Sequence, residues 1–76
     1  MLYCKFIGPN LLEVEEVTMS FFKTYRSWWY INTEKWLESS RGTKNDTPDR
    51  PMSEAGIEWC KKYYIPKATG GNNEQG

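Results

Sequence analysis

A Gly8-Pro9-Asn10 turn lies between two short apolar runs, and this arrangement leaves few folds open to the N-terminal part of the chain. Residues 2–7 are rich in Tyr, Phe and Ile, which favour β-strands. Residues 11–17 divide between the two faces that such a strand would have. Two runs of this kind joined by a three-residue turn that contains Gly and Asn predict a β-hairpin.

A helix is the alternative for the same region. Asn10 and Glu13 have the three-residue spacing of a capping box at a helix start. Five apolar residues also fall near one helical stripe, namely Leu11, Val14, Phe21, Phe22 and Tyr25. We favour the hairpin for residues 2–17, and residues 19–25 suit either a helix end or a strand.

The middle of the chain predicts three short elements. Bulky and β-branched side chains at 28–31 favour a strand. Thr33 is placed to cap a short helix over 34–40, with an acidic start and a Gly42 stop. Residues 42–51 hold two prolines, several Gly, Asn and Asp residues and no apolar anchor, which indicates a flexible loop.

The C-terminal part predicts one more helix and a tail. Ser53 is placed to cap a helix that runs to Tyr64, and Pro66 is expected to end it. Residues 67–76 are rich in Gly, Asn and Gln, which indicates disorder. We therefore expect one small domain over 1–66, with an α+β fold: a small antiparallel sheet, one or two short helices and a flexible C-terminal tail.

The overall composition limits the partners that a chain of 76 residues can attract. Ten basic residues balance ten acidic residues, so no net field draws the protein to nucleic acid or to an anionic membrane. No apolar stretch reaches the length of about 18 residues that a membrane span needs. The N-terminus lacks the features of a secretory signal, so the cytoplasm is the expected compartment.

The residue types that most enzymes need are missing from the sequence. Histidine is absent, and with it the commonest general base and metal ligand. No glycine-rich loop precedes a helix to hold phosphate. Cys4 and Cys60 are the two cysteines; they are expected to be free thiols, although a disulfide between them is open. We expect no enzymatic activity, no cofactor and no metal.

Three glutamates stand close together at positions 13, 15 and 16. On a strand, Glu13 and Glu15 share one face while Glu16 lies on the other. The cluster is therefore interpreted as a solvated acidic face, as a docking patch for a basic partner or, least of all, as a Mg²⁺ site.

The densest aromatic run covers residues 21–30, where six aromatic side chains alternate with two cations. Such a run supplies the core of a small protein or a surface on which bases stack and cations hold phosphates. Adjacent Trp28 and Trp29 cannot both point inward on a strand, so one of them is exposed or covered by another element. A second basic and aromatic stretch covers residues 59–64 with Lys67. It suits a helix whose lysines face solvent and whose tyrosines pack on the sheet, or a patch that binds nucleic acid.

These features suggest a binding surface in place of an active site. Charge along the chain is asymmetric, with acidic residues at 13–16 and basic residues at 23–26 and 61–67. Exposed Trp and Arg side chains are typical anchors of protein interfaces. The candidate partner-binding residues are Glu13, Glu15, Glu16, Arg26 and Trp29.

The stretches Met1–Asn10 and Ser27–Ile31, within a short chain rich in Trp and Tyr, resemble the host-takeover proteins of lytic bacteriophages. The resemblance is greatest to the inhibitors of host RNA polymerase, of which a Xanthomonas phage encodes one. It implies a cytoplasmic protein that binds bacterial RNA polymerase, disturbs its engagement of the promoter-specificity factor and alters termination. The alternatives are a single-strand nucleic-acid-binding protein and an inhibitor of a host defence nuclease.

Overall fold

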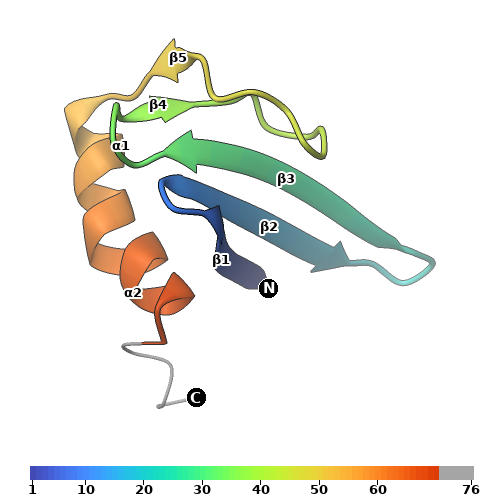
Figure 1. The fold of residues 1–76 in the computed structure, drawn as a ribbon. Coiled ribbons are helices and arrows are strands. Elements are labelled where there is room, and N and C mark those ends of the chain that lie inside the picture. The colour runs from blue at the N-terminus through green and yellow to red at the C-terminus, as the bar shows by residue number, and fades with distance from the viewer. Residues whose placement is uncertain (71–76) are drawn as a thin grey trace.

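A five-stranded antiparallel sheet with a helical segment on one face makes up the fold (Figure 1). The computed structural model describes residues 1–70. The strands lie in the sheet in their order along the chain: β1 (Leu2–Gly8), β2 (Leu11–Met19), β3 (Thr24–Asn32), β4 (Leu37–Glu38) and β5 (Arg50–Pro51). The predicted α+β fold is confirmed.

The N-terminal hairpin is confirmed, and the alternative helix is wrong. β1 pairs with β2 so that Cys4 lies opposite Val14, and the register shifts between Phe6 and Gly8 at the turn. The burial of β1 alternates at every residue, which is the pattern of a strand with one face on the core. The alternation of apolar side chains therefore decides this region over the capping-box spacing.

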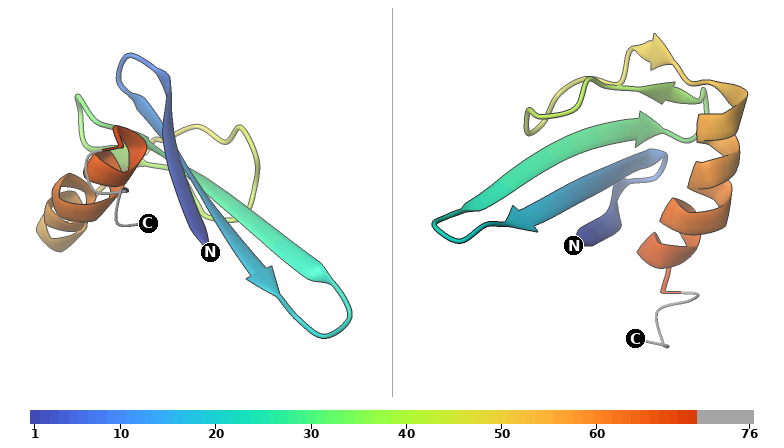
Figure 2. Two further views of the ribbon diagram at one scale, coloured as in Figure 1. Left: turned by 90° about the horizontal axis from the view of Figure 1, so that it is seen from below. Right: turned by 180° about the vertical axis from the view of Figure 1, so that it is seen from behind.

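β2 and β3 form a much longer hairpin. Their pairing continues from Leu11 opposite Asn32 to Met19 opposite Thr24. The turn is closed by Ser20, whose N–H donates to the Lys23 carbonyl at 2.9 Å and whose hydroxyl donates to the same carbonyl at 3.0 Å. This hairpin projects away from the helix and beyond the other strands (Figures 1 and 2).

The helix predicted over 34–40 is wrong. The Asn32 side-chain oxygen accepts hydrogen bonds from the N–H groups of Glu34 and Lys35, both at 2.9 Å, which makes a turn in place of a helix start. Trp36 then adopts a left-handed backbone with φ of 55°. The chain reverses there, and β4 pairs with the end of β3.

The predicted loop over 42–51 is irregular as far as Asp49, but its last two residues belong to the sheet. Arg50 and Pro51 pair with β4 as the short edge strand β5. Proline is tolerated at this position because an edge strand leaves one side of its backbone without a partner.

The helical segment runs from Glu54 to Ala68 as α1 (Glu54–Trp59), η1 (Cys60–Tyr64) and α2 (Ile65–Ala68). Ser53 caps it as predicted, because its hydroxyl accepts the Gly56 N–H at 3.0 Å. No helix among residues 1–70 is long and apolar enough to cross a membrane.

Pro66 does not end this segment, contrary to the prediction. η1 is a π-helical turn, in which the Ile65 N–H donates to the Cys60 carbonyl. This wider turn accommodates a residue that has no N–H and whose ring crowds the preceding turn of an α-helix. Lys67 and Ala68, predicted to be disordered, are helical, and the rest of that prediction at 71–76 lies outside the described residues.

The core lies between the helical segment and one face of the sheet. Its buried members are Leu12, Val14, Trp29, Ile31 and Cys60. The opposite face of β3 is covered by the loop that follows β4, and the Asn45 N–H of this loop donates to the Tyr30 hydroxyl at 2.9 Å. Figure 2 shows the helix on one side of the sheet and this loop on the other. β3 is therefore covered on both faces at its end nearest the helix.

Candidate protein-binding site

Glu13 is a buried carboxylate with a structural partner. Its side chain accepts the Tyr30 hydroxyl proton at 2.8 Å, and the Lys5 ammonium lies 3.9 Å away. A buried carboxylate is stable only when it is hydrogen-bonded or paired, and here it has both kinds of partner. Burial, with the Glu13 carboxylate as a further cause, raises the pKa of Tyr30, while the Asn45 N–H opposes that rise. The Glu13 carboxylate therefore stabilises the face of the sheet opposite the helical segment, and its contacts with Tyr30 and Lys5 leave it unavailable to a binding partner.

The other two glutamates lie on opposite faces of β2, as the strand prediction required. Glu15 shares the face of Glu13 and accepts a hydrogen bond from the Arg26 guanidinium at 3.0 Å. Glu16 is exposed on the face that carries Val14. The three carboxylates do not converge, so the structure offers no common site for Mg²⁺. Among residues 1–70, no group of three or more His, Cys, Asp or Glu side chains is placed to hold a metal.

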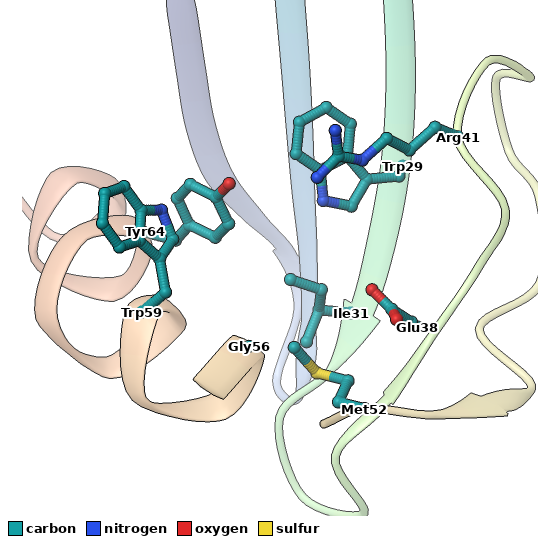
Figure 3. A pocket seen from close by; sticks show the side chains of 8 residues that line it. All are labelled: Trp29, Ile31, Glu38, Arg41, Met52, Gly56, Trp59 and Tyr64. Atoms are coloured by element: carbon teal, nitrogen blue, oxygen red, sulfur yellow. The ribbon is translucent and has the colours of Figure 1, made fainter. Parts of the chain in front are cut away.

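Trp29 is only 3% exposed and lies under the helical segment, so it is not a surface anchor in this structure. The Arg41 guanidinium lies 4.2 Å from the centre of its ring, and the Tyr64 ring packs edge-on at 6.1 Å. These side chains line a groove of about 360 Å³ between the helix and the sheet, and Trp59 lies at its helical wall (Figure 3). Trp28 points to the opposite face, where the Lys44 ammonium lies 5.5 Å from its ring.

Four large exposed apolar side chains, two of them almost fully exposed, lie at the end of the long hairpin. We call this group the tip cluster; its members are Met19, Phe21, Phe22 and Tyr25. Phe21 and Phe22 are 94% and 90% exposed, and their rings contact each other edge-on at 5.5 Å. The Lys23 ammonium lies 5.4 Å from the Tyr25 ring, which adds one positive charge to the cluster.

The tip cluster is the feature that sequence reasoning missed. The composition of residues 21–30 predicts a single unit, either a core or a surface on which bases stack. The signal that separates its two halves is Ser20, a turn-forming residue whose N–H and hydroxyl both bond the Lys23 carbonyl, which places Phe21 and Phe22 at the apex of the turn. Within residues 1–70, no element covers the apex of this turn, which leaves both rings exposed.

A second exposed aromatic pair lies on the helical segment. The Trp59 and Tyr63 rings are 4.0 Å apart and about half exposed, and Lys67 lines the same shallow pocket. The aromatic side chains of this helical segment differ in direction: Tyr64 packs inward against Trp29, whereas Tyr63 faces outward. This surface is smaller and less exposed than the tip cluster.

Cys4 and Cys60 are free thiols, as predicted. Burial raises the pKa of each to about 11, so both are protonated at neutral pH. A thiol in that state is a poor nucleophile and a poor metal ligand. The two cysteines therefore act as small apolar side chains between β1 and the helical segment.

Comparison with known proteins finds no family model, no curated protein and no solved structure that matches this chain.

Proposed function

We propose that this chain is a small binding protein without catalytic activity that inhibits or regulates bacterial RNA polymerase by direct protein–protein contact. The observation that carries the proposal is the tip cluster, in which the side chains of Phe21 and Phe22 are 94% and 90% exposed to solvent. Clustered aromatic side chains in an exposed, ordered position are typical of interface anchors that enter a pocket of a partner. The resemblance to phage inhibitors of host RNA polymerase supports the choice of partner.

The construction of the hairpin also favours binding. The pairing of β2 and β3 continues to Met19 and Thr24, directly beside the turn, and the Ser20 bonds to the Lys23 carbonyl close the turn. Ordering a loop during binding costs free energy, and a pre-ordered turn avoids most of that cost. Because the hairpin projects beyond the other strands, its tip can enter a pocket that the body of the protein cannot reach (Figure 1).

The test is a binding titration of the fluorescently labelled protein with purified bacterial RNA polymerase. The double variant Phe21→Ser/Phe22→Ser is expected to bind about 100-fold more weakly, since it removes two anchors. Tyr63→Ser is the matched control, because it truncates an aromatic side chain of 48% exposure on the helical segment. We expect its affinity to stay within about twofold of the parent protein.

Transcription assays then connect binding to effect. Run-off transcription with the promoter-specificity factor should fall when the parent protein is added, and a template with a terminator reports any change in termination. The double tip variant should lose both effects. Failure of the parent protein to bind polymerase, or equal binding by the tip variant, would contradict the proposal.

Single-strand nucleic-acid binding is a second candidate, favoured by the Trp59–Tyr63 pair with Lys67 beside it. Aromatic rings that stack bases next to a cation are typical of such surfaces. Affinity for an oligonucleotide should then fall linearly with salt on a log–log plot and should be lost in Tyr63→Ser. The same variant thus separates the two candidates, since protein binding through the tip cluster does not need Tyr63.

A further inference from the structure

The two edges of the sheet differ in how they are protected. At one edge, β5 has only two residues, and Pro51 carries no N–H that another strand could bond. At the other edge, β1 has seven residues and no proline, and its one register shift lies at the turn, between Phe6 and Gly8. Proteins commonly protect a long edge strand with proline, a bulge or a covering element, because an unprotected edge pairs with other chains.

The backbone of β1 presents a regular row of unpaired groups. Met1 and Val17 exchange two hydrogen bonds, both of 2.7 Å. In an antiparallel pair, alternate residues form such bonded pairs, so Tyr3 and Lys5 also bond toward β2. Leu2, Cys4 and Phe6 therefore direct their N–H and C=O groups away from the sheet, and within residues 1–70 no other hydrogen bond engages them.

The helical segment meets β1 from the core face of the sheet. α2 packs against β1, and the side chains of Leu2, Cys4 and Phe6 pack against the buried core on the same face. The outer backbone row is perpendicular to that face. A second strand can therefore approach β1 in the plane of the sheet.

We propose that β1 is the self-association surface of this protein, where two copies pair antiparallel about a two-fold axis at Cys4. In this register Leu2 of each copy lies opposite Phe6 of the other, and Cys4 lies opposite Cys4. The unpaired N–H and C=O groups of one β1 strand therefore face those of the other. The pairing forms about six new hydrogen bonds. The two sheets become one continuous ten-stranded sheet, and the symmetry closes the assembly as a dimer.

The side chains of β1 select this register. On the exposed face, Tyr3 of each copy lies opposite Lys5 of the other, which is a favourable aromatic–cation pair. A shift that centres the axis on Lys5 places two like charges directly opposite, which is unfavourable. The core-facing side chains Leu2 and Phe6 are apolar and meet across the new boundary. Self-complementarity of β1 therefore favours a second copy over an unrelated peptide.

Sedimentation velocity over a range of concentrations tests the proposal. We expect the parent protein to shift from the 9.0 kDa monomer toward twice that mass as concentration rises. Tyr3→Lys places a new lysine opposite Lys5 of the second copy at both symmetric positions, so the dimer should weaken about tenfold or more. The variant should still fold, since position 3 lies opposite Glu15 of β2, a carboxylate that suits a lysine.

Tyr25→Lys is the matched control. It makes the same substitution at a residue of similar exposure, 53% against 49% for Tyr3, but on β3 and away from the edge. The dimer of this variant should be unchanged. Circular dichroism should show that both variants are folded.

Hydrogen exchange of single amides provides the second measurement. The N–H groups of Leu2, Cys4 and Phe6 should exchange quickly in dilute protein and become protected as the dimer forms. A monomer at about 1 mM, where even a millimolar dissociation constant gives substantial dimer, would overturn the proposal. A dimer that resists Tyr3→Lys, or one whose three β1 amides stay unprotected, would overturn it equally. None of these outcomes depends on polymerase binding.

Discussion

The two halves of the aromatic run over 21–30 each carry three aromatic side chains and one cation, but their surroundings are opposite. Trp29 and Tyr30 are 3% and 1% exposed, whereas Phe21 and Phe22 are almost fully exposed. The first pair lies where the helical segment covers one face of β3 and the loop after β4 covers the other. The second pair lies at the end of the same hairpin, beyond both covers. The comparison indicates that an aromatic side chain stabilises the fold where another element covers it, and is available for binding where none does.

Truncation in the buried half should give the largest effect. Trp29→Ala removes the largest side chain between β3 and the helical segment, and a change of this kind costs about 3–5 kcal/mol. A domain of this size rarely has more than about 3–5 kcal/mol of net stability, so the variant should be largely unfolded. Urea denaturation followed by circular dichroism measures this. A loss below about 1 kcal/mol would show that the two halves differ less than their exposure indicates.

The hydrogen bonds on the second face should give the next largest effect. Tyr30→Phe removes the hydroxyl between the Glu13 carboxylate and the Asn45 N–H, and it leaves a buried carboxylate with one partner fewer. The expected loss is about 1–3 kcal/mol in the free energy of unfolding. Tyr25→Phe removes a half-exposed hydroxyl in the tip cluster and should change the stability little. Equal losses in the two variants would argue that the Glu13–Tyr30 contact does not stabilise the fold.

The thiols should make the buried region sensitive to alkaline pH. The pKa of Cys4 and Cys60 is about 11 in the folded chain and 9.0 without burial. The unfolded chain therefore releases these protons first, and the contribution of the neutral thiols, fully present below pH 9.0, is lost as pH rises toward about 11. We therefore expect the free energy of unfolding to fall steadily over this pH range. Urea midpoints between these pH values measure it, and a Cys4→Ala/Cys60→Ala variant with the same slope would contradict this origin.

Substitutions in the exposed half should change the free energy of unfolding least. Phe21→Ser/Phe22→Ser removes two rings that contact chiefly each other, so the free energy of unfolding should change by no more than about 0.5 kcal/mol. The same denaturation measurement applies. A larger loss would show that the tip cluster stabilises the hairpin, and the weaker polymerase binding expected of this variant would then need a folded control.

Part of the candidate site was predictable. The separation of Glu16 from Glu13 and Glu15 follows from the two-residue period of a strand, and the structure has it. The availability of these residues was not predictable, because it depends on cross-strand partners. Glu13 meets Tyr30 and Glu15 meets Arg26, and each of these contacts joins two strands. The predicted surface role of Trp29 failed for the same reason, since the helix that buries it starts 25 residues later in the chain.

Local patterns were sufficient for the elements whose residues satisfy one another nearby. The N-terminal hairpin follows from its turn and its alternation, and the start of the last helix follows from Ser53. Contacts between distant segments settled the rest. Residues 37–38 became a strand because the end of β3 was available for pairing, and β3 was buried on both faces because a helix and a loop meet there. A short sequence window records its own periodicity, but it carries no information about which surface will be covered and which will remain in water.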